Sequence, residues 1–246
     1  MTGEEKEIEI NISEIYDQLQ PPVPVPKAEQ KAEVFKELFD ETNENRIKRR
    51  CIEVSGDIDY KNLEFKLHPV TAALKAFKND AVIYTDTLLM KVAIIELILE
   101  EKEKASIDKP RGGFTSDKPA ESRVLRLPKI ICVAEHPKAE EFAKKYNVSK
   151  SMAGFMILKD ELRGSIVVIG KDAPALLGVC RMAERGILPY LILGFPAGVN
   201  TQVTSKEYLI KTKANLPTIA MEQTKGGIES AAVCFVELMK IYEEGL

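Results

Sequence analysis

The chain has 246 residues and a formal net charge of −3 at pH 7, so it can bury a large core but offers no basic field for nucleic acid. No apolar run is long enough to cross a bilayer, and the acidic start, MTGEEKEIEI, lacks the order of a signal peptide. Two histidines nearly exclude a multi-histidine metal site, and four widely spaced cysteines in apolar segments indicate free buried thiols. We therefore predict a cytoplasmic globular protein that binds neither nucleic acid nor membrane and holds no metal.

The N-terminal region is predicted to be an arm joined to a folded domain. Residues 1–30 are read as an acidic arm and a proline-rich linker, because the alternating prolines of QPPVPVPKAEQ cannot continue a helix or join a central strand. Residues 28–50 carry apolar residues at helical spacing, then turn residues and a second helical start. We predict that residues 31–246 form a single α/β domain.

Helix and strand patterns alternate from residue 69 onward. Residues 69–79 begin with proline and predict a helix, and 81–87, AVIYTDT, predict a buried parallel strand that ends in polar groups. A helix is predicted for 88–101. Residues 101–128 are charged and hold a Gly-Gly pair and three prolines, so they are predicted to be a long surface insertion.

The second half of the chain repeats this alternation and sets the fold class. The remaining predicted strands are 129–135, 164–170, 188–196 and 217–223, and the remaining predicted helices are 137–147, 149–162, 173–186, 205–213 and 228–244. This rhythm predicts a three-layer α/β/α domain, Rossmann-like, with a mainly parallel sheet and helices on both faces.

Ligands of open α/β sheets bind beyond the carboxyl ends of the strands, a rule that selects four stretches of this chain. They are TDT (85–87), GKDAP (170–174), GFPAGV (194–199) and TKGGIES (224–230). None contains a nucleotide fingerprint, and the glycines at 170 and 194 also fit plain strand-ending turns. TKGGIES is more suggestive, because paired glycines before a long helix admit a ligand and helix N-termini favour anions, although a plain helix-start loop remains the alternative.

The order of several blocks resembles the precorrin-8X methylmutase family. The blocks are SGDIDYKNLEFKLHP, AVIYTDT, GSIVVIGKDAPALL, LILGFPAGV followed by SKEYL, and GGIESAAV, from about residue 46 to the C-terminus. The resemblance implies a three-layer α/β homodimer that binds a corrinoid tetrapyrrole rich in carboxylates. It also implies a methyl shift between neighbouring carbons of ring C, giving hydrobyrinic acid or its cobalt counterpart, with no redox cofactor or catalytic metal.

One position departs from the family motif. The motif places a histidine between an aliphatic residue and a Gly-Asp pair, and this chain reads IEVSGD at 52–57, so Glu53 stands where the histidine is expected. The resemblance implies that the histidine at this position assists the rearrangement by protonating or hydrogen-bonding the ring. Imidazole is poised near neutral pH, whereas a glutamic acid that donates a proton must be kept neutral by burial or nearby acids.

The resemblance gives a candidate site with Glu53 as the catalytic group. The expected substrate contacts are Ser55, Thr85, Asp86, Thr87, Lys150, Ser151, Gly194, Pro196, Gly198, Lys225, Gly226 and Gly227. Lys150 replaces an expected arginine and loses the bidentate fork for a carboxylate. Glu222 and Thr224 also stand where the family usually shows arginines.

These departures leave three readings open. The chain is a corrinoid isomerase, or a paralogue that binds or carries a tetrapyrrole without catalysis, or a family fold recruited for another small acidic metabolite. His68 is a candidate for the missing imidazole, with helix capping or plain surface exposure as its alternatives. His136 has the same alternatives.

Overall fold

The computed structural model describes residues 42–107 and 127–245. In chain order the elements are α3 (Asn43–Ser55), the 3-10 turn η1 (Ile58–Asn62), β1 (Leu63–Lys66), α4 (Pro69–Lys78), β2 (Ile83–Thr85), α5 (Leu88–Ile107), β3 (Ile130–Cys132), η2 (Val133–Glu135), α6 (Ala139–Tyr146), α7 (Lys150–Ile157), η3 (Lys159–Leu162), β4 (Ile166–Ile169), α8 (Ala173–Glu184), β5 (Leu191–Gly194), α9 (Thr201–Lys211), β6 (Thr218–Met221) and α10 (Ile228–Glu244). The predicted arm at 1–30 lies outside the described residues.

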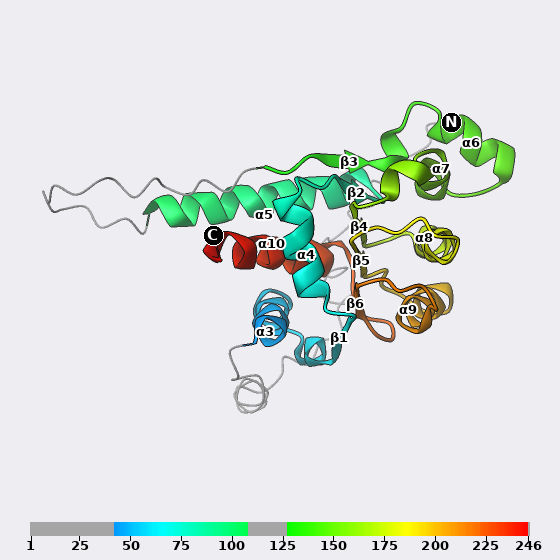
Figure 1. The fold of residues 1–246 in the computed structure, drawn as a ribbon. Helices are drawn as coiled ribbons and strands as arrows, with labels where there is room; N and C mark the ends of the chain where they lie inside the picture. The colour runs from blue at the N-terminus through cyan, green and yellow to red at the C-terminus, as the bar shows by residue number, and fades with distance from the viewer. Residues whose placement is uncertain (1–41, 108–126, 246) are drawn as a thin grey trace, which may run out of the picture.

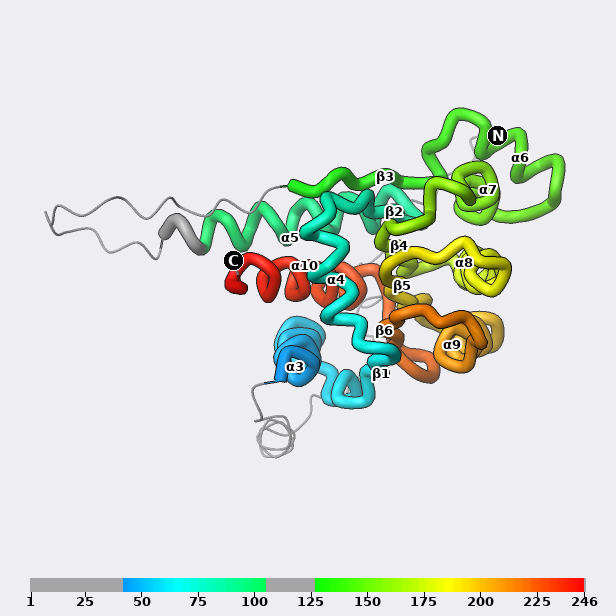
Figure 2. The backbone as a smooth tube through the Cα atoms, in the orientation of Figure 1, coloured from blue at the N-terminus to red at the C-terminus, as the bar shows by residue number. Residues whose placement is uncertain are grey.

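One six-stranded sheet, in the order β1-β6-β5-β4-β2-β3, divides the described residues into three layers. Strand β1 pairs antiparallel with β6, and all other neighbours are parallel. Helices α3, α4, α5 and α10 cover one face, and α7, α8 and α9 cover the other (Figure 1). The tube view shows the same division (Figure 2). The predicted three-layer α/β fold is confirmed.

Alternate residues of each strand enter different cores. In β4, Ile166 and Val168 join the core beneath α5 and α10, whereas Val167 and Ile169 join the core beneath α7 and α8. All four are fully buried. Because both faces are covered, the strand reads as a continuous apolar run instead of an alternating one.

Several elements differ from the sequence prediction. Helix α9 begins at Thr201 instead of 205, and the helix predicted for 149–162 ends at Ile157 and is followed by η3. The helix predicted for 88–101 continues to Ile107, so the first residues of the segment read as an insertion are helical. Strand β1 was not predicted, and it pairs Leu63 with Met221 and Lys66 with Thr218. Most of the predicted 101–128 insertion lies outside the described residues.

Helix α3 ends at the glycine turn that follows Glu53. Gly56 adopts φ 71°, a left-handed conformation, and its N–H donates to the carbonyl of Ile52. The carboxylate of Asp57 then accepts the N–H of Asp59 at 3.0 Å and opens η1. These two caps place Glu53 in the last turn of α3.

All four cysteines are free and buried, as predicted. Burial raises the pKa of Cys51 to about 12, so this thiol is inert at neutral pH. Within residues 42–107 and 127–245, no helix is long and apolar enough to cross a membrane. The same residues hold no group of three or more histidine, cysteine or acidic side chains arranged for a metal ion.

Candidate functional site at the carboxyl edge of the sheet

The parallel strands β2, β4, β5 and β6 bring the four selected stretches to one edge of the sheet, which we call the carboxyl edge. Antiparallel β1 adds a fifth segment to this edge. Its first residue, Leu63, pairs with Met221, the last residue of β6, so η1 and the end of α3 lie there as well. The strand order and directions therefore place these distant segments at one edge of the sheet.

Asp86 holds the loop after β4 in place. It is fully buried, and its Oδ2 accepts the N–H of Lys171 at 2.8 Å and the N–H of Asp172 at 2.9 Å. Asp172 in turn caps α8 by accepting the N–H of Ala175 at 2.8 Å. Burial raises the pKa of Asp86, whereas the backbone N–H groups favour its charged form. In this structure the side chain supports the edge from within.

The other two residues of TDT also have internal partners. Thr85 is fully buried and its hydroxyl donates to the carbonyl oxygens of Thr87 and Ile131, at 3.4 and 3.5 Å. The hydroxyl of Thr87 accepts the N–H of Met90 at 3.2 Å in the first turn of α5. Of the three, Thr87 is the more accessible residue.

The loops after β5 and β6 are bonded directly to each other. The N–H of Gly198 donates to Thr224 at 2.8 Å, and the N–H of Gly227 donates to the carbonyl of Phe195 at 2.6 Å. Gly226 has φ +134°, and a Cβ there would lie 2.3 Å from the same Phe195 carbonyl oxygen. Glycine at 226 is thus required by the approach of one loop to the other.

Two further predicted contacts in these loops are buried. A Cβ at Gly194 would lie 2.5 Å from the Leu209 side chain, so this glycine makes room for α9 against β5. Pro196 is buried as well. By contrast, nothing lies within 4 Å of a Cβ built on Gly227. Among the predicted contacts in these loops, Gly198 and the Lys225–Gly227 turn are partly accessible.

Lys225 joins the turn after β6 to η1. Its ammonium pairs with Asp57, and with Asp59 at 3.1 Å. The hydrogen bond to Asp57 is the main reason that the pKa of Lys225 is raised. Tyr60 adds a second tie, because its hydroxyl bonds to the Gly226 carbonyl at 3.2 Å and to Ser230. In this structure, therefore, two carboxylates of the chain itself already compensate the Lys225 charge.

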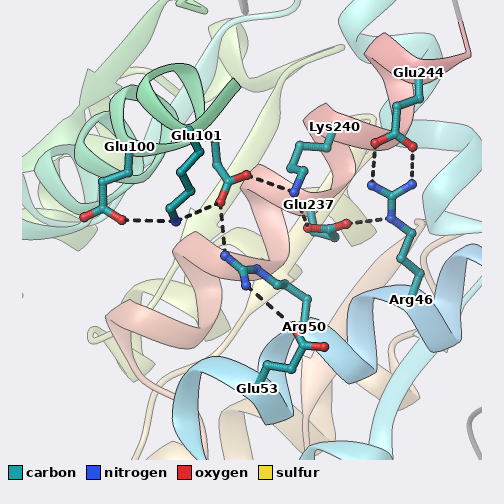
Figure 3. A network of polar contacts seen from close by, with 9 residues as sticks. Arg46, Arg50, Glu53, Glu100, Glu101, Glu237, Lys240 and Glu244 are labelled. Carbon is teal, nitrogen blue, oxygen red and sulfur yellow. Dashed lines mark hydrogen bonds and ion pairs between the residues drawn. The ribbon is translucent and has the colours of Figure 1, made fainter. Parts of the chain in front are cut away.

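Glu53 borders a charged hollow between α3, α5 and α10 (Figure 3). Its side chain is 51% exposed and pairs with Arg50 at 3.5 Å. The hollow measures about 330 Å³ and is lined by Arg46, Arg49, Arg50, Glu53, Glu101, Lys104, Glu237 and Lys240. Ser55, two residues further on, is exposed at the end of α3, and its hydroxyl donates to Cys51 at 2.7 Å.

The ion pairs around the hollow tie three helices together. Arg46 of α3 contacts Glu237 at 2.6 Å and Glu244 at 2.8 Å, both on α10. Glu101 of α5 contacts Arg50 at 3.1 Å and Lys240 at 2.9 Å. Arg46, near the start of α3, contacts residues in the second half of α10. Tyr60, which follows the end of α3, bonds to Ser230 near the start of α10, so the two helices run in opposite directions. Glu53 therefore lies toward the carboxyl-edge end of the pair.

The Glu101 carboxylate is expected to stabilise the fold less in acid. Burial favours its protonated form, but the cations of Lys240, Lys104 and Arg50 outweigh burial and lower the pKa of Glu101 below its ordinary value of 4.5. The unfolded chain then binds more protons, so this contribution to stability is present above pH 4.5 and is lost as the pH falls through the folded-state pKa. Urea unfolding at pH 7 and pH 3.5 measures the difference in the free energy of unfolding between wild type and Glu101→Gln. This difference should be smaller at pH 3.5. Exposed Glu96→Gln is the control, and a constant Glu101 difference would contradict the prediction.

Lys150 and Ser151 lie on the β3 side of the sheet, whereas Lys225 follows β6. Lys150 begins α7 and pairs with Glu140 at 3.1 Å, and Ser151 is buried. Helix α7 lies against η2, which follows β3 (Figure 2). Four inter-strand steps separate β3 from β6, roughly 19 Å at the usual strand spacing. A ligand that contacts both Lys150 and Lys225 must therefore be broad.

The two histidines lie at opposite ends of the parallel strands. His68 follows β1, whose last residue pairs with the first of β6, so it lies away from the carboxyl edge. It occupies the N-cap position of α4 with φ 53° and makes no side-chain cap. His136 lies at the carboxyl edge after η2, and its Nδ1 accepts the N–H of Lys138 at 3.2 Å. The place of His68 therefore argues against its supplying the missing imidazole at the carboxyl edge.

Comparison with known proteins shows to which family the chain belongs. The family model described as precorrin-8X methylmutase (CbiC) matches residues 28–111 and 119–241, which include Glu53 and every predicted contact. The chain belongs to the precorrin-8X methylmutase family. The gap in the match, between 111 and 119, falls within the predicted 101–128 insertion.

Relatives in this family cover most of the chain. A cobalt-precorrin-8 methylmutase of Methanocaldococcus jannaschii is 30% identical over 199 residues, 79% of each chain. A cobalt-precorrin-8 methylmutase of Leptospira interrogans is 28% identical over 188 residues, 73% of this chain and 74% of the relative. A solved precorrin-8X methylmutase from Thermus thermophilus has a TM-score of 0.65 at 21% identity, over 87% of this chain and 98% of that one. A precorrin-8X methylmutase related protein gives 0.64 at 21% identity, over 82% and 93%. The two structures establish the shared fold.

Proposed function

We propose that this family member is a corrinoid isomerase that moves a methyl group on ring C of precorrin-8 or cobalt-precorrin-8, giving hydrobyrinic acid or its cobalt counterpart. The observation that carries the proposal is the meeting, at one edge of the sheet, of the blocks that resemble the family. The M. jannaschii relative, named a cobalt-precorrin-8 methylmutase and matched over most of both chains, supports the same reaction. The reaction is an internal migration with no net gain or loss of atoms or electrons, so a proton that Glu53 donates to the ring returns to Glu53 before the product leaves.

The width and polarity of the carboxyl edge suit a flat macrocycle with many carboxylate side chains. Lys150 and Lys225 lie toward opposite ends of it, and the Gly226–Gly227 turn precedes the N-terminus of α10, where backbone N–H groups favour anions. We propose that the side-chain carboxylates of the macrocycle contact these cations and this turn. Ser55, Thr87 and Gly198 are accessible enough for direct contact. The buried Thr85, Asp86, Ser151, Gly194 and Pro196 support the edge from beneath.

Glu53 is the proposed catalytic group, acting as proton donor or hydrogen-bonding partner to the ring. Its side chain is half exposed in the free protein, at the carboxyl-edge end of α3. A macrocycle lying over it would remove water and favour the neutral, proton-donating form of a carboxylic acid. In the free protein Glu53 pairs with Arg50 at 3.5 Å, so substrate binding must separate that pair before Glu53 can face the ring.

The ion pair between Glu53 and Arg50 favours a second function. Because Glu53 stands where the family resemblance places a histidine and is held beside a cation, the chain can have kept the binding edge and lost the chemistry. It would then bind or carry a tetrapyrrole without turnover. For either function we propose a cytoplasmic homodimer, as the resemblance implies, and the free buried cysteines fit a reducing compartment.

Incubation of the purified full chain with precorrin-8 and, separately, with cobalt-precorrin-8 tests the proposal. Substrate and product are isomers of equal mass, so conversion is followed by absorbance and by chromatographic retention against authentic hydrobyrinic acid and its cobalt counterpart. Product formation supports the isomerase and shows which substrate is used. Binding without conversion supports the carrier, and no binding of either corrinoid contradicts both.

A further inference from the structure

Lys206 on α9 is a fully buried lysine that the proposed chemistry does not use. Burial lowers its pKa to about 8, which reflects the removal of an ammonium group from water. Lysine is almost never fully buried without a partner. Its Nζ donates to the carbonyl oxygen of Lys225, in the turn between β6 and α10.

This hydrogen bond fixes the orientation of one peptide group. A trans peptide is planar, with its C=O and N–H pointing in opposite directions, and none of the described residues is preceded by a cis bond. Because the Lys225 carbonyl points inward to Lys206, the N–H of Gly226 points the other way, away from Lys206.

The next peptide of the same turn is held by other partners. The carbonyl of Gly226 accepts the Tyr60 hydroxyl at 3.2 Å, and the N–H of Gly227 donates to Phe195 at 2.6 Å. Gly226 itself has φ +134° and cannot carry a side chain beside the Phe195 carbonyl. The turn is thus held from three sides, by α9, η1 and the loop after β5.

We infer that Lys206 is a positioning residue that holds the Lys225–Gly226 peptide so that the Gly226 N–H is presented to a carboxylate of the substrate. The inference rests on the proposed function, which supplies the carboxylate. Lys206 is itself buried and does not touch the ligand. A charged donor on the carbonyl both orients the peptide and strengthens its N–H as a hydrogen-bond donor, which a neutral apolar side chain does not do.

Three variants of the full chain test this role. Lys206→Met removes the donor, Lys206→Gln keeps a neutral donor, and Lys211→Met is the control, because Lys211 is an exposed residue of the same helix paired with Glu207 at 3.6 Å. The probe is hydrobyrinic acid, titrated by its absorbance. We expect Lys206→Met to raise Kd at least tenfold, Lys206→Gln to raise it less, and Lys211→Met to leave it unchanged. The KM for precorrin-8 should rise in parallel, while kcat stays within about threefold.

A measurement without ligand separates this inference from the proposed function. Hydrogen exchange of the free protein should be faster in Lys206→Met than in wild type at Gly227, whose N–H is bonded to Phe195, with the β4 amides unchanged. Wild-type exchange and wild-type affinity in that variant would overturn the inference. If wild type fails to bind hydrobyrinic acid, the proposed function and the carboxylate role both fail, whereas faster exchange would still show that Lys206 holds the turn. If Lys206→Met does not fold, Lys206→Gln decides by the same two readouts.

Discussion

Replacing Glu53 with alanine should lower the turnover of precorrin-8 by about 10²–10⁴-fold and leave the affinity for hydrobyrinic acid within about threefold. Positioned proton donors contribute rate factors of this size. The side chain is half exposed and its Arg50 pair is a surface ion pair, so its removal should leave the fold intact. Steady-state kcat and an absorbance titration of the same protein sample measure the two quantities.

Three further variants sharpen this prediction. Glu53→Gln keeps a hydrogen-bonding group without an acidic proton, so it separates proton donation from hydrogen bonding. Glu53→His restores the imidazole that the family resemblance implies. Glu44→Ala, at an exposed residue in the first turn of the same helix, is the control. Wild-type turnover in Glu53→Ala would remove Glu53 from the mechanism. An inactive wild type that gains turnover in Glu53→His would establish the carrier reading.

Replacing Asp86 with alanine should lower the free energy of unfolding by roughly 3 kcal/mol. The change removes a fully buried carboxylate and leaves the N–H groups of Lys171 and Asp172 without their acceptor. Urea denaturation measures the loss. Asp86→Asn keeps one acceptor oxygen and should lose roughly half as much.

The matched control for Asp86 is Asp160→Ala, because Asp160 is exposed in η3. Its effect should stay within about 0.5 kcal/mol. A loss for Asp86→Ala no larger than that of the control would show that the loop after β4 is held by other contacts.

The layers and the carboxyl edge were predictable because they depend on local patterns. The stretch GSIVVIG contains a fully buried strand, and burial on both faces is what makes such a run continuously apolar. The parallel topology then places the ends of β2, β4, β5 and β6 together whatever their loops contain. Gly56 is also a local signal for the end of α3, because a left-handed helix cap favours glycine.

Features that depend on distant partners could not be read from the sequence. Strand β1, LEFK, has four residues and is defined by its pairing with β6. Helix α5 runs past Glu101, where long-range ion pairs to α3 and α10 hold a segment that looks like a charged loop.

The roles of several site residues also needed the structure. Lys225 was expected to contact substrate but pairs with Asp57 and Asp59, and Lys206 within SKEYL was assigned no role. The deciding contact joins Lys225 to a segment 168 residues away and Lys206 to one 19 residues away. The one available signal for Lys206 was its place in a block that resembles the family.

A crystal structure of the full chain with bound hydrobyrinic acid tests the central claim most directly. The macrocycle should lie across the carboxyl ends of β2, β4, β5 and β6, with a side-chain carboxylate within hydrogen-bond distance of the Gly226 N–H and with Glu53 facing the ring. A macrocycle bound at the opposite edge, beside His68, or on the outer faces of α8 and α9, would contradict the account.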